Sequence, residues 1–118
     1  MASLNMHGPY PMSSAAITRE VTKTSAGNYA LGYVNADGTF IVQYVGRSDS
    51  DVAARLRQHL SEGYERFKYS YATSPKAAFE KECRNYHDFG ESRALVNSLH
   101  PDRPAGTYWK CPCCRIFD

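Results

Sequence analysis

The feature that most restricts the fold of this chain is a pair of strand-like segments joined by a strong turn signal. Residues 27–34 (GNYALGYV) and 39–46 (TFIVQYVG) are rich in β-branched and aromatic side chains, which pack well on a pleated sheet. Residues 35–38 (NADG) lie between them, and glycine tolerates the positive φ that tight turns require. The sequence therefore predicts a β-hairpin and, with it, an antiparallel sheet.

Further segments carry the periodicity of regular secondary structure. Residues 51–61 place apolar side chains four residues apart behind Ser and Asp cap candidates, which predicts a helix. Residues 66–72 (RFKYSYA) alternate aromatic and polar side chains, as a strand does. A second helix is predicted over residues 75–89, and residues 91–99 predict a short helix or a turn. Together these elements predict an α+β fold with a three-stranded antiparallel sheet flanked by helices.

The chain divides into an arm, a domain and a tail. Residues 1–25 show no sustained period of two or of 3.6, which is typical of a flexible arm. Residues 26–97 hold the predicted elements, and 118 residues suffice for one compact domain. Residues 98–118 contain Pro and Cys and are too irregular to fold without a staple. We therefore expect one domain with an N-terminal arm and a Cys-rich tail packed on it.

Charge and hydropathy restrict the partners of the chain. The net charge is +2, lower than in proteins that bind DNA mainly by neutralising phosphates, so duplex affinity should be modest and sensitive to salt. The apolar runs are far shorter than the roughly 18 residues that span a bilayer. The sequence before Arg19 has no Lys or Arg and no apolar run, unlike a secretory signal. We expect no membrane partner and a reducing, cytoplasmic location.

Five side chains of the predicted elements form a candidate site. Arg55 and His59 are four residues apart and so share a helix face. Tyr29 and Tyr44 lie on the two strands of the hairpin, and Glu82 lies on the second predicted helix. A guanidinium, an imidazole, a carboxylate and two phenols in one cavity suit phosphodiester cleavage, because its transition state gathers negative charge on the phosphoryl oxygens.

The order of these residues is specific. Two tripeptides, GNY at 27–29 and YVG at 44–46, precede an Arg and a His four residues apart, a later Glu and Asn97. In this order the sequence resembles the GIY-YIG nuclease domain. It departs from that pattern at Asn28, which replaces an apolar residue, and at Val45, which replaces Ile. Neither side chain needs to do chemistry.

The resemblance implies a small stand-alone endonuclease that hydrolyses DNA, including branched or damaged DNA, with Mg²⁺ or Mn²⁺. Glu82 would bind the metal, which keeps several water ligands and so needs few carboxylates. Arg55 would hold the scissile phosphate as a planar cation, and Tyr29 would orient or deprotonate the attacking water. The other roles implied are assistance to this tyrosine, by Tyr44 and His59, and substrate binding, by Gly46, Arg47 and Asn97.

Two alternatives stay open on the sequence. Glu80 lies two residues before Glu82, and a two-residue shift turns a helix by about 200°, so only one of them can face the site. An Ala four residues before the Glu, here Ala78, is a common arrangement of the family and favours Glu82. The chain is alternatively a non-catalytic, zinc-stabilised module that binds nucleic acid or another partner.

Cysteine and histidine positions predict a separate structural metal site. Cys83 and His87 are four residues apart on the second predicted helix, and Cys111 and Cys114 form a C-x-x-C pair in the tail. These four ligands suit tetrahedral zinc, which would pin the tail to the helix. Open alternatives are Cys113 or His100 as ligands, and a Cys111–Cys114 redox pair, although a redox C-x-x-C normally opens a helix.

Overall fold

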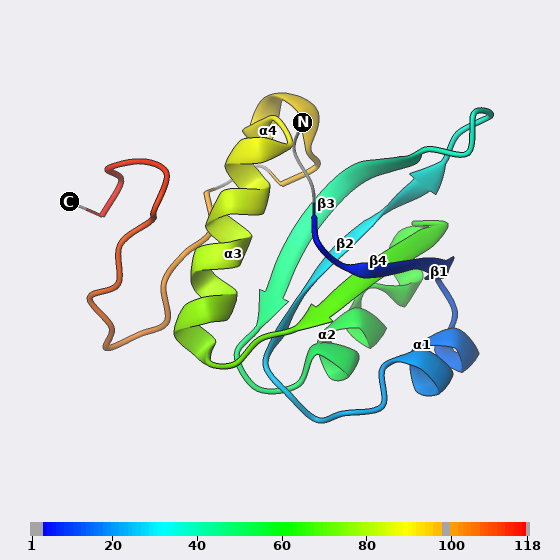
Figure 1. The fold of residues 1–118 in the computed structure, drawn as a ribbon, viewed down its shortest axis with the longest axis horizontal. Coiled ribbons are helices and arrows are strands. Elements are labelled where there is room, and N and C mark those ends of the chain that lie inside the picture. Colours follow the sequence, from blue (N-terminus) through cyan, green and yellow to red (C-terminus); the bar gives the residue numbers. More distant parts are fainter. Residues whose placement is uncertain (1–3, 98–99, 118) are drawn as a thin grey trace.

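A computed structural model describes residues 4–97 and 100–117 of the chain and gives an α+β fold (Figure 1). Residues 1–3 of the expected arm, and residues 98–99 and 118 of the expected tail, lie outside the described part. Among the described residues, no helix is both long and apolar enough to cross a bilayer.

Within the described residues, the sheet has four strands, which corrects the expected number of three. Neighbouring strands are antiparallel, and their order across the sheet is β1-β4-β2-β3. One edge of the sheet is therefore β1 and the other is β3 (Figure 1). The strands are β1 (His7–Pro11), β2 (Gly27–Val34), β3 (Phe40–Ser48) and β4 (Arg66–Tyr71).

The predicted hairpin is formed by β2 and β3. Tyr29 lies opposite Gly46 in the register of the two strands. In the turn, the Asn35 side chain accepts hydrogen bonds from the backbone N–H groups of Asp37 and Thr39, as short polar side chains do in tight turns. The local sequence thus accounts for the turn, while a shift of register between Leu31 and Gly32 places Tyr29 opposite Gly46.

The N-terminal segment is folded, which corrects the expectation of a flexible arm for its described residues. β1 pairs with β4, and α1 (Ser14–Glu20) inserts the fully buried Ile17 into the core. The Ser13 side chain caps α1 by accepting a hydrogen bond from the Ala16 N–H. These elements contain only 5 and 7 residues, so neither shows a sustained period in the sequence. Tertiary packing supplies their stability.

The remaining helices lie close to their predicted positions. α1 and α2 cover one face of the sheet, and α3 covers the other (Figure 1). Because side chains alternate along a strand, Tyr29 packs with the α2 side while Asn28 and Ala30 pack with α3. The helices are α2 (Val52–Gln58), which is followed by a 3₁₀ turn (Leu60–Glu62), α3 (Pro75–Asp88) and α4 (Glu91–Ala94).

The C-terminal tail, residues 100–117, contains no helix or strand and packs against α3 away from the sheet (Figure 1). Its apolar contact is a small cluster of its own, separate from the two cores that cover the sheet. The cluster consists of Phe79, Cys83 and Cys111, with Trp109, Cys114 and Phe117 packed against it. An irregular segment of this kind needs a further constraint to stay ordered.

Candidate functional site

A pocket of about 430 Å³ opens where β2 and β3 meet α2 and α3. Its walls come from segments far apart in the sequence, and they bring together six of the residues predicted to form the site. Arg55 enters from α2 and Glu82 from α3, while the hairpin supplies the rest. The six residues are Tyr29, Tyr44, Gly46, Arg47, Arg55 and Glu82.

Gly46 is required by the position of the Tyr29 ring. A Cβ atom added at Gly46 would collide with Cζ and Oη of Tyr29, so the ring crosses the opposite strand where only hydrogen leaves room. Tyr29 is 1% exposed, and its ring is nearly parallel to that of Tyr44, with centroids 6.4 Å apart. Gly46, in the second tripeptide, thus leaves the space that the ring of Tyr29, in the first tripeptide, occupies.

A chain of polar contacts runs from Tyr29 away from the pocket. His59, the residue after α2, places Nε2 at 2.7 Å from the Tyr29 hydroxyl and Nδ1 at 2.8 Å from Oε1 of Glu62. A carboxylate only accepts hydrogen bonds, so Nδ1 carries the proton and donates a hydrogen bond to Glu62. Nε2 is then the acceptor for the Tyr29 hydroxyl. This arrangement suits the transfer of a proton from the phenol to the imidazole.

Sequence reasoning placed His59 beside Tyr29 but missed Glu62. The signal was available, because Glu62 follows His59 by three residues and such pairs meet on a helical turn. His59 is 8% exposed and does not line the pocket, so it acts on the pocket through Tyr29.

Burial holds both pocket tyrosines in the neutral form. Burial, reinforced by the charge of Tyr44, raises the pKa of Tyr29 far above its ordinary value, although the Arg55 guanidinium bonded to the phenol opposes the shift. Burial and the charge of Glu82 likewise raise the pKa of Tyr44. Neither phenol is a phenolate at neutral pH, so Tyr29 can act as a base only if its own proton leaves at the same time.

Arg47 and Glu82 form a tight ion pair inside the pocket. Nη1 of Arg47 lies 2.6 Å from Oε1 of Glu82, and Nε of Arg47 lies 3.0 Å from Oδ1 of Asp49. The Arg47 and Glu82 side chains are 13% and 12% exposed. Burial raises the pKa of Glu82, while the positive charge of Arg47 opposes this shift. Arg47 therefore stabilises the carboxylate form of a buried acid.

The structure distinguishes Glu82 from Glu80, because only Glu82 lines the pocket. It lies one turn after the fully buried Ala78, whose carbonyl accepts a hydrogen bond from the Asn28 side chain at 2.9 Å. The residue that departs from the family pattern in the first tripeptide thus ties β2 to α3. This bond fixes the helix that carries Glu82 against the strand that carries Tyr29.

Asn97 occupies a different place from the predicted substrate-binding one. Its Oδ1 accepts from the Val45 N–H at 2.9 Å, and its Nδ2 donates to the Val45 carbonyl at 2.8 Å. Both polar groups of the amide are therefore engaged by the edge strand β3, and Asn97 does not line the pocket. Its position is that of a structural residue behind the second tripeptide.

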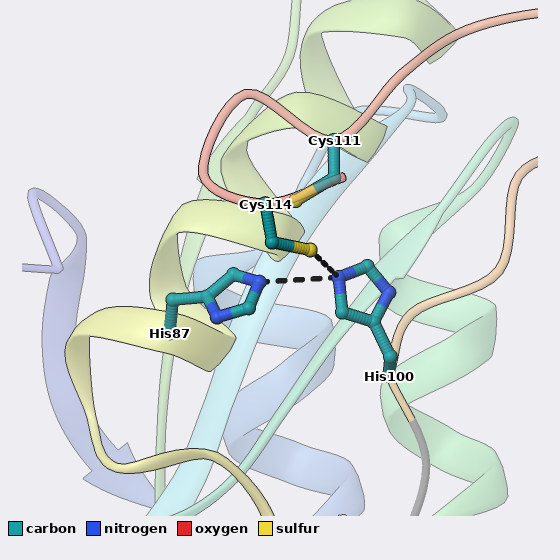
Figure 2. Close-up of side chains that lie close together, drawn as sticks. All are labelled: His87, His100, Cys111 and Cys114. Carbon is teal, nitrogen blue, oxygen red and sulfur yellow. Dashed lines mark hydrogen bonds between the residues drawn. The ribbon is translucent and has the colours of Figure 1, made fainter. Parts of the chain in front are cut away.

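A second cluster of functional groups lies between the end of α3 and the tail. Ligand atoms of His87, His100, Cys111 and Cys114 all lie within 4.8 Å of one another, and this group can hold a metal ion such as zinc (Figure 2). We call these four residues the tail clasp. Three of them were predicted, whereas His100 takes the place predicted for Cys83.

The two imidazoles of the tail clasp are oriented as metal ligands are. Nδ1 of His87 lies 2.6 Å from Oε2 of Glu91, and Nδ1 of His100 lies 2.7 Å from the Pro101 carbonyl oxygen. Each Nδ1 therefore carries the proton, which leaves Nε2 with a lone pair. The two Nε2 atoms face each other at 3.1 Å, with Sγ of Cys114 3.4 Å from that of His100 (Figure 2). Facing lone pairs repel unless a cation lies between them.

The cysteines near the tail clasp differ in their chemistry. Burial opposes ionisation of Cys111, but hydrogen bonds, that from the Cys113 N–H above all, lower the pKa of its thiol to about 6. A thiolate is the form that binds metal. Burial instead raises the pKa of Cys83, which packs as an apolar group between Phe79 and Cys111. Cys83 lies one turn before His87 and packs in this apolar cluster, outside the group of four ligand atoms.

No family model, curated protein or solved structure matches this chain. The chemistry of the pocket and of the tail clasp is therefore the basis on which a function can be assigned.

Proposed function

We propose that the chain is a divalent-metal-dependent endonuclease of GIY-YIG type that hydrolyses DNA phosphodiester bonds. The observation that carries the proposal is the convergence of Tyr29, Arg55 and Glu82 from β2, α2 and α3 on one open pocket. The resemblance of the sequence to that domain independently predicts the same three residues. A convergent guanidinium, phenol and carboxylate match the needs of phosphoryl transfer better than those of simple binding.

Arg55 binds the phosphate in this proposal. It lines the pocket, its guanidinium faces the Tyr29 phenol, and its side chain is exposed enough to reach a substrate. A guanidinium stays charged at any working pH and presents parallel N–H groups to phosphate oxygens. Charge that develops on the phosphoryl oxygens is therefore met by a fixed cation.

Tyr29 and His59 move the proton. The attacking water gives its proton to Oη of Tyr29 as the phenolic proton passes to Nε2 of His59, 2.7 Å away. The water oxygen forms the new bond to phosphorus as the bond to the leaving oxygen breaks, and the leaving oxygen takes up a proton from solvent at the open side of the pocket. Glu62 stabilises the resulting imidazolium through Nδ1. The high pKa of Tyr29 is no obstacle, because the phenol never becomes a free phenolate.

The donor set fits one divalent cation. Glu82 uses Oε1 for Arg47, so Oε2 can serve as a ligand, and Mg²⁺ or Mn²⁺ accepts a single carboxylate together with water and phosphate oxygens. Such a cation neutralises charge on the phosphoryl oxygens when it is bound. Arg47 fixes the orientation of the carboxylate, and its positive charge opposes the rise that burial causes in the pKa of Glu82.

The experiment that tests this function is cleavage of supercoiled and branched DNA with Mg²⁺ or Mn²⁺, with Glu82→Gln as the inactive variant. Glu80→Gln is the matched control, because it changes the same kind of side chain on the same helix outside the pocket. We expect cleavage by the wild type and by Glu80→Gln, and a loss of about 100-fold or more in Glu82→Gln. Equal cleavage by both variants, or none by the wild type, refutes the catalytic proposal. DNA binding without cleavage would instead favour the non-catalytic module.

We also infer that the tail clasp holds a structural Zn²⁺. Zn–N bonds of about 2.0–2.1 Å in a tetrahedron place two nitrogen ligands about 3.3 Å apart, close to the 3.1 Å between the two Nε2 atoms. Two thiols and two imidazoles form a closed set that leaves no position for a substrate. Metal analysis of the purified chain should give one zinc per chain, lost in Cys114→Ser but kept in Cys113→Ser, because Cys113 lies outside the cluster. Zinc retained by both variants contradicts the ligand set.

A further inference from the structure

The tail segment between His100 and Cys111 borders the candidate active pocket. Asp102 lies two residues after His100 and lines the pocket together with Arg47 and Glu82. His100 is bonded through Nδ1 to the carbonyl oxygen of the buried Pro101, so the position of the imidazole and the path of the next residues are linked. The position of His100, a residue of the tail clasp, thus influences the position of Asp102 at the pocket wall.

A second route joins the tail to the same wall through Phe79. The Trp109 and Phe117 rings pack on Phe79 with centroids 6.1 Å and 5.9 Å away. The guanidinium of Arg47 lies over Phe79 at 5.3 Å from its centroid, a cation–π contact. Arg47 in turn binds Glu82 at 2.6 Å. The aromatic residues of the tail therefore support the ring on which the pocket arginine rests.

The tail is braced internally by one arginine. Nη1 of Arg103 donates to the Trp109 carbonyl at 3.1 Å, and its guanidinium lies 4.7 Å from the Phe117 centroid. Arg103 thus joins the segment beside Asp102 to both aromatic residues that contact Phe79. These contacts hold the two ends of the tail together, although its described residues 100–117 form no helix or strand.

We propose that metal loading of the tail clasp assembles the candidate active pocket, by seating Trp109 and Phe117 on Phe79 behind Arg47 and by placing Asp102 at the pocket wall. Ordering the irregular residues 100–117 loses conformational entropy, and four metal–ligand bonds that tie the tail to α3 offset this loss. Loss of the ion releases the tail, and with it the support of the Arg47–Glu82 pair. This inference rests on the proposed function only in treating the pocket as catalytic.

The test uses two structural readouts besides activity. Trp109 is the only tryptophan of the chain, so its fluorescence reports whether the tail is docked. The side-chain Nε–H signal of Arg47 in nuclear magnetic resonance, assigned with Arg47→Lys, reports the position of the guanidinium that binds Asp49 through Nε and Glu82 through Nη1. The exposed Arg19 serves as the internal reference. After zinc removal by a chelator, we expect a longer emission wavelength for Trp109 and a shifted or broadened Arg47 signal, with Arg19 unchanged. Readdition of Zn²⁺ should reverse both changes.

Trp109→Ala separates support of the pocket from metal binding. This variant keeps all four ligands of the tail clasp and removes one of the rings packed on Phe79. We expect full zinc content, a shifted Arg47 signal and cleavage about 10-fold lower than that of the wild type. Tyr108→Phe is the control, because Tyr108 is 88% exposed, and it should match the wild type in all three measurements.

Failure of this inference and failure of the proposed function give different results. If the Trp109 and Arg47 signals respond to zinc but no DNA is cleaved, the coupling stands and the nuclease proposal fails. If DNA is cleaved equally with and without zinc, and the Arg47 signal is the same in both states, the nuclease proposal stands and the coupling is refuted. An unchanged Trp109 emission after complete zinc removal also overturns the coupling, since the tail is then docked without the ion.

Discussion

The Tyr29 hydroxyl and Nε2 of His59 are 2.7 Å apart, and this contact joins the open pocket to a histidine that the pocket itself does not expose. Because Nδ1 of His59 donates a hydrogen bond to Oε1 of Glu62 at 2.8 Å, the imidazole is fixed in the tautomer whose Nε2 accepts the phenolic proton. The contact thus gives a buried phenol of high pKa a route for proton transfer. It is the part of the proposed mechanism that mutagenesis can test most directly.

Tyr29→Phe and His59→Ala should not be additive. If the two groups form one relay, each substitution alone removes proton transfer and lowers kcat by about 10²- to 10⁴-fold. The double variant should then have about the same kcat as the less active of the two single variants, since the effects of residues that act as a unit are not additive. Single-turnover cleavage of the four proteins measures this, with Tyr108→Phe as the control. Losses that multiply in the double variant would mean that the two residues act independently.

Glu62→Gln should reduce cleavage while leaving the fold intact. The Glu62 side chain is 45% exposed, so its pair with His59 contributes less than about 1 kcal/mol to the free energy of unfolding. An amide can still accept a hydrogen bond but cannot stabilise the imidazolium by charge, and we expect kcat to fall about 10-fold or more. Glu65→Gln, at an exposed position three residues further on, is the matched control. Equal activity of both variants would remove Glu62 from the mechanism.

Much of the fold is encoded in short-range patterns that a single sequence reveals. The hairpin follows from strand-forming segments around a turn, and α3 follows from a capping Ser74 and from Pro75 at its first position. Part of the pocket is predicted by the order of residues along the chain, namely Tyr29, Tyr44, Arg47, Arg55 and Glu82. That order is informative because Gly46 and Tyr29 must meet across the hairpin, where the ring leaves no room for a Cβ atom at residue 46. The register shift between Leu31 and Gly32, which makes them opposite, is not visible in the sequence.

The parts that sequence reasoning missed depend on contacts between distant segments. β1 is a strand only because β4 provides its hydrogen-bonding partner, and its Pro and Gly residues disguise it in the sequence. His100 reaches the tail clasp because the chain turns back after α4, a path that no local pattern specifies. Cys83 has the better spacing to His87, but it points into the Phe79 cluster. Asp102 at the pocket wall follows from the same unpredicted path.

Gly46→Ala should abolish cleavage with little direct effect on any polar group. The added methyl group would occupy the space of Cζ and Oη of Tyr29, so the phenol must move away from His59 or the strands must separate. Overpacking of this kind destabilises a protein by about 1–3 kcal/mol. We expect a lower midpoint of urea unfolding and a loss of activity comparable to that of Tyr29→Phe. In the background of Tyr29→Ala, which removes the ring, Gly46→Ala should lower the free energy of unfolding by much less than it does in the wild type. An equal loss in the two backgrounds would show that the close approach is not the cause.

The buried tyrosines should make the protein lose stability at alkaline pH. Burial raises the pKa of Tyr29 above its ordinary value of 10, and burial, with the charge of Tyr71, raises that of Tyr69 to about 12. For an acid with a raised pKa in the folded state, the folded protein binds more protons than the unfolded chain between the two pKa values, so stability is full below pH 10 and falls as the pH rises further. Urea unfolding at several alkaline pH values should show this fall.

Tyr69→Phe should be less stable at neutral pH by about 1 kcal/mol, since it loses the hydrogen bond that the hydroxyl donates to the Glu20 carbonyl. Its stability should then depend less on pH between 10 and 12 than that of the wild type. Equal slopes for the two proteins would show that Tyr69 titrates alike in the folded and unfolded states.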